Sequence, residues 1–365
     1  MTPADLSRTV LHAVRRAVDE DALRAPVPAR VRVERTRPGG SGDYACAVAL
    51  QLAGPAALPA LEVARILRER VAAEPGIERV EITGPGFLSF TLDATAEHHR
   101  ALLDAVREQG LAYGHGDALR DEILQFHHAR EVRAAVTAHA VRRLVISQGA
   151  RVRISCEEAP DPDWARLGVT VDAHGTPPVP LTGIRPVPAG ATAAELLRRL
   201  GPDAARWGLL RPAGHDRAAL GPELLVQGEA NSLFRVRYAH ARVRALTRGA
   251  ALLGFTAEPT PYAERAGHTE PAPYDSAARP LLDLIADHPG VLLAAARHRA
   301  PDRAARQLEA VAHAFFDFHD SCPPLPAGDE KPSAAHRARL ALAEAAGTVL
   351  AGGLSLLGIR APEHL

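Results

Sequence analysis

The stretch Asn231-Ser-Leu-Phe-Arg-Val-Arg-Tyr-Ala-His-Ala-Arg242 lies within the most regular segment of this 365-residue sequence. Between residues 229 and 253, apolar side chains recur every three or four positions, which predicts a long amphipathic helix. Its predicted buried stripe comprises Leu233, Val236, Ala239, Val243, Leu246, Ala250 and Leu253. The helical segments predicted in this part of the chain are 193–200, 203–210, 222–253, which contains this stretch, 277–286, 289–299, 302–319 and 334–357. The C-terminal part of the chain therefore reads as an all-α domain.

The same long helix is unusually basic. Arg237, Arg244 and Arg248 are predicted to project from the face opposite the apolar stripe. A flank between the two faces is predicted to carry Arg235, Tyr238 and Arg242. Arginines without an intervening acid, interleaved with one aromatic ring, suit contact with RNA phosphates and stacking on bases. The alternative is a basic helix face that is merely solvated.

The N-terminal part is predicted to be an α+β domain. Helical periodicity occurs at 4–20, 58–73 and 95–110, and strand-like segments lie near 31–33, 80–83 and 87–92. The turn Gly84-Pro-Gly86 separates the last two strands. Strand alternation places Phe87 and Ser89 on one face, with Leu88 and Phe90 on the other. An aromatic ring on a sheet can stack on an unpaired base, whereas a core phenylalanine is the alternative.

The middle of the chain reads as one strand–helix–strand unit, the smallest piece of a parallel sheet. The strands are predicted at 122–126 and 151–155, with a helix over 130–148 between them. A helix that begins after a strand offers an anion site at its N-terminus. This unit is rich in arginine, with Arg130, Arg133, Arg142, Arg143, Arg151 and Arg153 against the acid Glu131. The alternative is again a solvated helix face. A metal site at His127, His128 and His139 is not expected, because no third ligand follows at helical spacing.

Composition narrows the chemistry. The 43 basic and 43 acidic residues give no net charge, which argues against coating of a polyanion by the whole chain. The one lysine, Lys331, lies in a predicted loop, so P-loop, protein-kinase and Schiff-base chemistry are disfavoured. The cysteines Cys46, Cys156 and Cys322 support neither a disulfide framework nor a thiolate zinc site. The sequence starts without a recognisable signal peptide, and we expect a cytoplasmic protein that does not contact membranes.

Five segments in colinear order resemble arginyl-tRNA synthetases. The segments Gly42-Asp-Tyr-Ala-Cys-Ala-Val-Ala-Leu-Gln-Leu52 and Gly84-Pro-Gly-Phe-Leu-Ser-Phe-Thr-Leu92 resemble that family's N-terminal tRNA-elbow domain. The segment Gly201-Pro-Asp-Ala-Ala-Arg-Trp-Gly-Leu-Leu-Arg211 resembles the end of its catalytic domain. The stretch 231–242 resembles the opening of its DALR-type anticodon-binding domain, and Gly353-Leu-Ser-Leu-Leu-Gly-Ile-Arg-Ala-Pro-Glu-His-Leu365 resembles its C-terminus.

The resemblance implies a multidomain α+β fold. An N-terminal α+β tRNA-elbow domain is expected at 1–112, a shortened Rossmann-like α/β remnant at 113–215, and an all-helical anticodon-binding domain at 216–365. By family position, Tyr238, His364 and Leu365 would face the anticodon loop, and Phe87 and Ser89 the tRNA elbow. Arg235 stands where the family often has an aromatic residue.

The expected catalytic centre departs from the family pattern. His128-Ala129-Arg130-Glu131 takes the place of a His-x-Gly-His signature, so Arg130 would fill the adenine space and Glu131 would repel phosphate. Thr182-Gly-Ile-Arg-Pro-Val-Pro188 takes the place of the lysine-bearing Lys-Met-Ser-Lys loop, with Arg185 as its cation. The segment between the two signatures is also much shorter than a synthetase needs.

We therefore expect a catalytically degenerate paralogue that binds tRNA without aminoacylating it and needs no cofactor. The expected partner is tRNA, an arginine isoacceptor first. One alternative is a residual arginine–tRNA ligase, which would use ATP. Another is an adaptor that contacts a protein partner and presents tRNA to another enzyme.

Overall fold

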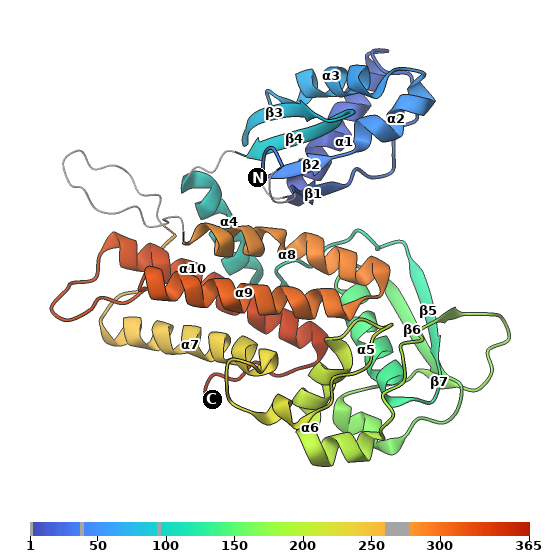
Figure 1. The fold of residues 1–365 in the computed structure, drawn as a ribbon, viewed down its shortest axis with the longest axis vertical. Coiled ribbons are helices and arrows are strands. Elements are labelled where there is room, and N and C mark those ends of the chain that lie inside the picture. Colours follow the sequence, from blue (N-terminus) through green and yellow to red (C-terminus); the bar gives the residue numbers. More distant parts are fainter. Residues whose placement is uncertain (1–2, 37–39, 93–95, 260–276) are drawn as a thin grey trace. The chain divides into compact units, whose positions relative to one another are not determined.

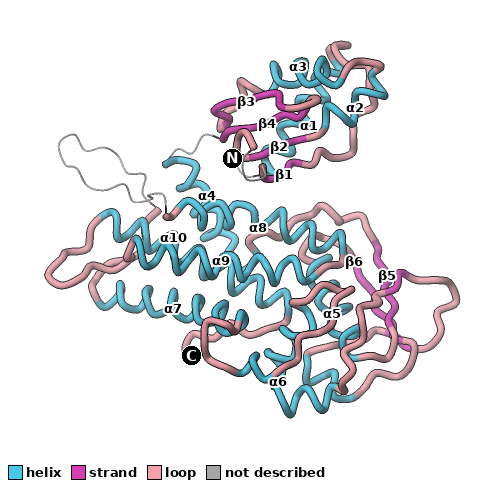
Figure 2. Tube along the Cα trace, viewed as in Figure 1, coloured by secondary structure: helices cyan, strands magenta, loops and turns pink. Residues whose placement is uncertain are grey.

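The structure is a computed structural model that describes residues 3–36, 40–92, 96–259 and 277–365. The chain divides into two compact units, Met1–Leu102 and Leu103–Leu365. Figure 2 shows strands in both units and the longest helices in the second. The predicted fold class, a multidomain α+β chain with a parallel sheet and a C-terminal helical region, is confirmed. The predicted boundaries after residues 112 and 215 stay a prediction.

The first unit is an antiparallel sheet covered by helices. Its strands follow the order β1-β2-β4-β3, and every neighbouring pair is antiparallel. The strands are β1 (Val33–Arg35), β2 (Tyr44–Cys46), β3 (Ile77–Thr83) and β4 (Phe87–Leu92). The helices are α1 (Pro3–Asp19), α2 (Val48–Ala56) and α3 (Ala60–Val71). Leu88 and Phe90 of the central strand β4 are fully buried in the core that the sheet shares with these helices.

Two short elements of this unit were not predicted. β2 has three residues, which is too short for alternation to be visible in the sequence. α2 contains Gly54 and Pro55, both poor helix formers. The helix α4 (Ala96–Gln109) carries the boundary between the units and is followed by a short 3-10 turn, Gly110–Ala112.

The second unit contains a parallel sheet of order β7-β6-β5-β8. Its strands are β5 (Ile123–His128), β6 (Arg151–Cys156), β7 (Ala173–His174) and β8 (Thr182–Gly183), and each neighbouring pair is parallel. The helix α5 (Val132–Ile146) links β5 to β6 and packs against both. Phe126 and Ile154 point toward that helix and are buried.

The other face of this sheet is open to solvent. The described side chains of Gln125, Arg151 and Arg153 are exposed on it, and Ile123 is 63% exposed. All-parallel sheets are normally covered on both faces. This sheet therefore has an incomplete cover in the part of the chain that the structure describes.

A helical bundle occupies the rest of the unit (Figure 1). After α6 (Ala193–Leu210) and a 3-10 turn, Pro222–Leu225, the chain forms α7 (Ser232–Leu252), α8 (Arg279–His298), α9 (Pro301–Ser321) and α10 (Ala334–Leu357). α10 contacts α7, α8 and α9 and is mostly buried. It is long and apolar enough to span a bilayer by length and composition, but most of it is buried inside the protein. Its apolar side chains instead form the centre of the bundle.

The helix boundaries confirm one prediction and correct two. The predicted segments 193–200 and 203–210 are helical on either side of a kink in α6, where Gly201 adopts the non-helical angles φ +73° and ψ 174°. The segments 277–286 and 289–299 form one helix, with Pro289 inside it. The predicted helix over 222–253 is instead a 3-10 turn followed by α7, which begins after Asn231.

Candidate nucleic-acid interface

α7 begins where the sequence supplies a helix cap. The Asn231 side-chain oxygen accepts a hydrogen bond from the Phe234 amide at 3.2 Å. Its side-chain nitrogen donates to the carbonyls of Leu224 and Val226 at 2.8 and 2.9 Å. Asparagine is a favoured N-cap residue. Asn231 thus fixes both the start of the basic helix and the loop that leads into it.

The predicted apolar stripe of α7 is buried, with one exception. Leu233, Val236, Ala239, Val243, Leu246 and Ala250 are all buried against the bundle. Leu253 was assigned to the stripe wrongly, since its side chain is 51% exposed. The helix has ended at Leu252, and Gly254 turns the chain with φ +75°, so helical spacing no longer applies.

Tyr238 is the centre of an aromatic stack on the surface of the bundle. Its ring lies parallel to Phe234, with centroids 5.6 Å apart and an interplanar angle of 5°. Phe316 of α9 stacks on it at 5.6 Å and 22°. Tyr238 remains 43% exposed. The structure therefore pre-orients this ring while leaving part of it accessible.

Arg235 and Arg242 lie along the same flank as Tyr238. Arg235 is half-buried, and Arg242 is exposed. The Arg242 guanidinium is 3.3 Å from the imidazole Nε2 of His319 on α9. The predicted grouping of these two arginines with Tyr238 on one flank matches their positions along α7.

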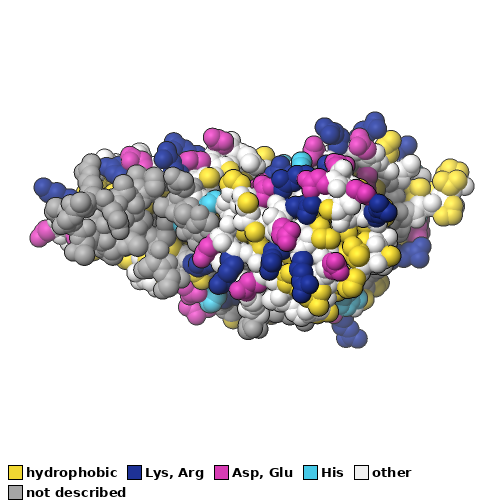
Figure 3. Space-filling view, turned by 90° about the horizontal axis from the view of Figure 1, so that it is seen from above, with side chains coloured by type: hydrophobic (Ala, Val, Ile, Leu, Met, Phe, Trp, Pro, Cys, Tyr) yellow, Lys and Arg dark blue, Asp and Glu magenta, His cyan; other side chains and the backbone are white. Residues whose placement is uncertain are grey.

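Arg244 and Arg248 lie beside the C-terminal tail. Arg244 forms an ion pair with Glu363 at 3.0 Å, and Arg248 lies 3.4 Å from Nδ1 of His364. His364 and Leu365 are exposed. Acidic and basic side chains also lie next to one another on the face drawn in Figure 3. The basic face of α7 is thus partly neutralised by the chain's own last residues.

Arg237 corrects the prediction that it projects freely with Arg244 and Arg248. Its side chain is 25% exposed and lies 4.0 Å from the buried Asp203 of α6. The Nε atom of Arg237 is buried without a hydrogen-bond partner among the described residues. Asp203 also binds Arg360, with Nε to carboxylate at 3.0 Å. Residues of the C-terminal tail and of α6 cover α7 around Arg237. Helical periodicity within α7 could not predict this contact, because the covering residues are distant in sequence.

The tail is held along α7 by a further contact. Nδ1 of His240 lies 2.8 Å from the Pro362 carbonyl and donates to it. Burial lowers the pKa of His240, while the bond to that carbonyl opposes the shift. The contacts of His240, Arg244 and Arg248 place residues 362–364 against one side of the helix.

Phe87 and Ser89 belong to the first unit, whereas the α7 residues belong to the second. Phe87 is 37% exposed at the start of β4, so it is not a core phenylalanine. Ser89 is buried, and its hydroxyl lies 2.8 Å from that of Thr83 on β3. The hairpin thus offers an exposed ring, while the serine is engaged within the sheet.

The segment His128-Ala129-Arg130-Glu131, which we predicted to replace a family signature, runs from the end of β5 to the start of α5. His128 is buried, with Nδ1 2.8 Å from the Ala129 carbonyl and its ring tilted against Trp164. Burial lowers the pKa of His128, so its imidazole is neutral near pH 7. Arg130 is exposed and donates from Nε to the Ala159 carbonyl at 2.9 Å.

Glu131 closes the N-terminus of α5. One carboxylate oxygen accepts the Ala134 amide at 2.8 Å, and the other accepts the Ala189 amide at 2.8 Å. The side chain is therefore the N-cap of α5 and a tie to the loop after β8. It occupies, with its own negative charge, the position at which a helix N-terminus would bind an anion.

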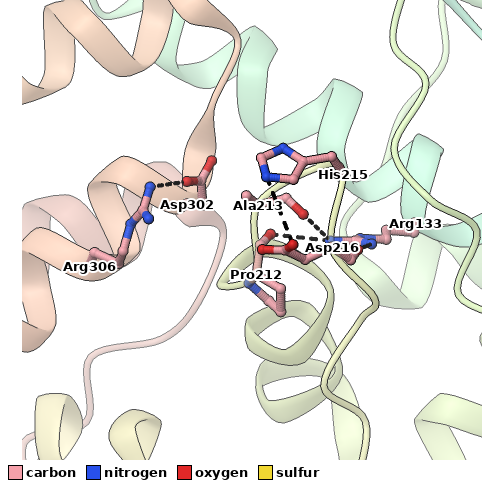
Figure 4. Close-up of polar contacts among 7 residues, drawn as sticks. All are labelled: Arg133, Pro212, Ala213, His215, Asp216, Asp302 and Arg306. Atoms are coloured by element: carbon pink, nitrogen blue, oxygen red, sulfur yellow. Dashed lines mark hydrogen bonds and ion pairs between the residues drawn. The ribbon is translucent and has the colours of Figure 1, made fainter.

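Arg133 is a core residue that the sequence assigned to a basic surface. Its guanidinium is buried and donates to five backbone carbonyls, as Figure 4 shows in part. The acceptors are Leu209 at 2.9 Å, Val187 at 2.9 Å, Asp216 at 2.5 Å, Pro212 at 3.1 Å and Ala213 at 2.9 Å. Arg133 thus binds α5 to the end of α6 and the loop after it. The missed signal is that α5 is apolar on most of its circumference, which is typical of a buried helix.

The remaining predicted groups of this region lie apart. Nδ1 of His127 lies 2.8 Å from the Ser155 hydroxyl, and His139 is buried within α5. No group of three potential metal ligands was found among the described residues. Lys331 is exposed on the loop between α9 and α10, and Arg185 is exposed after β8. The described cysteines Cys46, Cys156 and Cys322 are buried and unbridged.

Comparisons with known proteins agree with this arrangement. The profile of the arginyl-tRNA synthetase N-terminal domain matches residues 5–92, and that of the DALR anticodon-binding domain matches residues 236–365. The arginine–tRNA ligase of Frankia alni is 27% identical and aligns over the whole of both chains. That alignment is 563 positions long, whereas this chain has 365 residues, so a large part of the relative has no counterpart here.

Solved structures share the fold. The arginyl-tRNA synthetase of Thermus thermophilus is 15% identical, with a TM-score of 0.67 and full coverage of both chains. That of Plasmodium falciparum is 8% identical, with a TM-score of 0.67 over 100% of this chain and 99% of the other. The two matched domains stand at either end of the chain, in the family's order and around a parallel sheet, and this protein belongs to the arginyl-tRNA synthetase family.

Proposed function

We propose that this chain is a non-catalytic member of its family that binds tRNA through its N-terminal and anticodon-binding domains. The observation that carries the proposal is the Glu131 carboxylate at the N-terminus of α5. There it accepts hydrogen bonds from the backbone amides of Ala134 and Ala189, which would otherwise be free to bind an anion. A nucleotide phosphate would have to displace a charged group that already satisfies them.

The neighbouring residues support the same conclusion. His128 is buried and neutral, so it offers no positive charge to a transferring phosphate. Arg133 points into the core and binds carbonyls rather than a ligand. An enzyme that catalyses adenylation must place positive groups where negative charge develops on the phosphate in the transition state. The described residues at the start of α5 supply a carboxylate at that place instead.

Binding of tRNA is supported by the domains and by the surfaces they present. By their descriptions, one matched domain is an anticodon-binding domain and the other is the N-terminal domain of arginyl-tRNA synthetase. Tyr238 is a stacked, partly exposed ring beside the exposed Arg242, and Phe87 is a second exposed ring in the other unit. An arginine isoacceptor is the tRNA we expect, because the family relatives are arginine-specific by name.

An active arginine–tRNA ligase is the competing function. It is favoured by the end-to-end match to the Frankia alni ligase. Such an enzyme would bind ATP and arginine beside the parallel sheet. The exposed cation nearest the second signature position is Arg185, which carries charge without the compact ammonium of lysine.

Nucleotide binding separates the two functions. A ligand at about 100 times its dissociation constant adds about 2.7 kcal/mol to the free energy of unfolding. We expect no rise in melting temperature with Mg-ATP and arginine, and no arginine-dependent exchange of pyrophosphate into ATP, while labelled tRNA binds. An active arginyl-tRNA synthetase assayed in parallel provides the positive control. Exchange above background would establish the ligase and overturn the proposal, and absence of tRNA binding would overturn it as well.

A further inference from the structure

Three arginines surround the open face of the parallel sheet without an acidic partner. Arg151, Arg153 and Arg185 are exposed, and none forms an ion pair or side-chain hydrogen bond with a residue that the structure describes. Other arginines of the same unit are paired, such as Arg142 with Asp172 at 3.1 Å and Arg199 with Glu195 at 2.8 Å. Exposed arginines elsewhere in the unit, such as Arg198, Arg217 and Arg303, also have no acidic partner among the described residues, so these three are distinguished by their common place at one open sheet face.

The strand register places two of these arginines side by side with polar residues. On β6, positions 151, 153 and 155 share the open face, and on β5 positions 123, 125 and 127 share it. The paired residues are Ile123 with Arg151, Gln125 with Arg153, and His127 with Ser155. These six residues, together with Arg185, are called the arginine sheet face below.

A glycine lets Arg185 reach this face. Gly183 of β8 pairs with His127, so a side chain at position 183 would point to the same side of the sheet. A Cβ atom placed on Gly183 would lie 2.9 Å from the Arg185 Nε atom. The Arg185 side chain therefore lies across Gly183, beside His127. Because Gly183 has no side chain, there is room for the Arg185 side chain over this part of the sheet.

The chemistry of the face favours a polyanion over an apolar partner. Its one large apolar side chain is Ile123, which leaves little hydrophobic area for a protein helix to bury. None of the seven residues is acidic, and Glu157 and Glu158 begin beyond the last paired residue of β6. Arginines two positions apart on a strand are separated by about 7 Å, which resembles the step between neighbouring phosphates of one nucleic-acid strand. Arginine also binds phosphate through two parallel hydrogen bonds.

We propose that the arginine sheet face binds the phosphodiester backbone of tRNA as a second contact, separate from α7. Figure 1 shows the sheet and α7 at different ends of the second unit, so the two surfaces would meet different parts of one RNA. Gln125, His127 and Ser155 supply hydrogen-bonding groups between the arginines. The inference rests on the proposed tRNA binding, but it concerns residues that the binding of α7 does not require.

Salt titration of tRNA affinity tests the proposal. Removing a phosphate contact lowers the slope of log affinity against log salt by about one unit. The double variant Arg151→Ala/Arg153→Ala is expected to lower that slope by about two units and to weaken binding at least about tenfold. Arg185→Ala should lower it by about one unit, because it removes the third cation from the face. Gly183→Ala should lower it by less, because the new Cβ atom displaces the Arg185 side chain without removing its charge. The matched control is Arg166→Ala/Arg199→Ala, which removes the same charge from two arginines that already have acidic partners.

The outcomes distinguish this inference from the proposed function. Unchanged affinity and slope in the Arg151/Arg153 variant, with tRNA binding by the wild type intact, overturn the sheet contact and leave tRNA binding standing. Equal losses in the variant and in the control would also overturn it, because they would reflect overall charge alone. A wild type that does not bind tRNA overturns both. Each substituted arginine is exposed, so we expect all variants to fold. Their melting temperatures verify this.

Discussion

α5 and α7 are both helices that follow a cap residue and carry several arginines, yet they use them in opposite ways. In α5, the guanidinium of Arg133 is buried and satisfied by five carbonyls. In α7, Arg244 is 45% exposed and is paired with Glu363 of the C-terminal tail. The difference shows that arginine content does not identify an RNA-binding surface. The elements that pack around each helix determine whether its cations stabilise the fold or face a ligand.

The N-cap residues of the two helices also differ in charge. Glu131 places a carboxylate at the start of α5 and ties it to Ala189, whereas Asn231 places a neutral amide at the start of α7. A negative charge at a helix N-terminus stabilises the helix and excludes another anion from it. The N-terminus of α5 is therefore satisfied within the protein, whereas α7 exposes Arg242, Arg244 and Arg248.

The largest expected effect is on the buried arginine. Arg133→Met should lower the free energy of unfolding by about 3–5 kcal/mol, because buried carbonyls lose their charged donor. Arg244→Met, the matched change on α7, should cost about 1 kcal/mol or less, because its ion pair is exposed. Urea denaturation followed by the fluorescence of Trp164 and Trp207 measures both. Similar losses for the two variants would show that the helices do not differ in this way.

Acid should weaken the core around α5. Burial lowers the pKa of His139 to about 4, and Arg206, Arg143 and Arg142 add to the shift. Burial likewise lowers the pKa of His288 to about 4, with the bond to Gln307 opposing it. Each histidine stays neutral in the folded chain and gains a proton on unfolding below about pH 6.5. Its contribution to stability is complete above pH 6.5 and is lost as the pH falls toward 4.

For each histidine the loss should reach about 3 kcal/mol at most. Denaturation of His139→Leu and His288→Leu at pH 7 and pH 4.5 measures the effect. Each variant should lose less stability over this interval than the wild type. A wild-type pH dependence retained in both variants would assign acid sensitivity to other groups.

Stacking on α7 should contribute to binding without changing the salt dependence. Tyr238→Ala is expected to weaken tRNA binding by about 1–3 kcal/mol with an unchanged salt slope, since stacking releases no counterions. Tyr238→Phe should retain affinity because the ring keeps its stacking contacts with Phe234 and Phe316. Phe87→Ala provides the equivalent test in the first unit. If Tyr238→Ala binds tRNA like the wild type, this ring only stabilises the bundle.

The smallest expected effect concerns a single exposed ion pair. Arg244→Ala should reduce the salt slope by about one unit, whereas Arg142→Ala on α5 should leave it unchanged. Glu363→Gln should instead strengthen binding slightly, because it removes the carboxylate that competes with RNA for Arg244. Fluorescence titrations at several salt concentrations distinguish these changes. Identical slopes for Arg244→Ala and Arg142→Ala would remove the functional distinction between the two helices.

Local patterns alone determined much of this protein. Helical spacing predicted α7 and its buried residues from Leu233 to Ala250, and alternation predicted which face of β4 holds Leu88 and Phe90. The strand–helix–strand pattern around α5 and the order of the family segments were also readable from the sequence. These features depend on neighbours within a few residues, so the spacing of residue types along the chain suffices to predict them.

The tertiary structure decided the fate of the charged groups. Arg133 is buried because the end of α6 and the loop from Pro212 to Asp216 close over α5. Arg237 turns to Asp203, and Arg244 meets Glu363, because the C-terminal tail returns along α7. Arg151 and Arg153 remain open because α5 covers the opposite face of their sheet. Each outcome depends on elements distant in sequence, and a local pattern carries no information about which of them will pack on a given side chain.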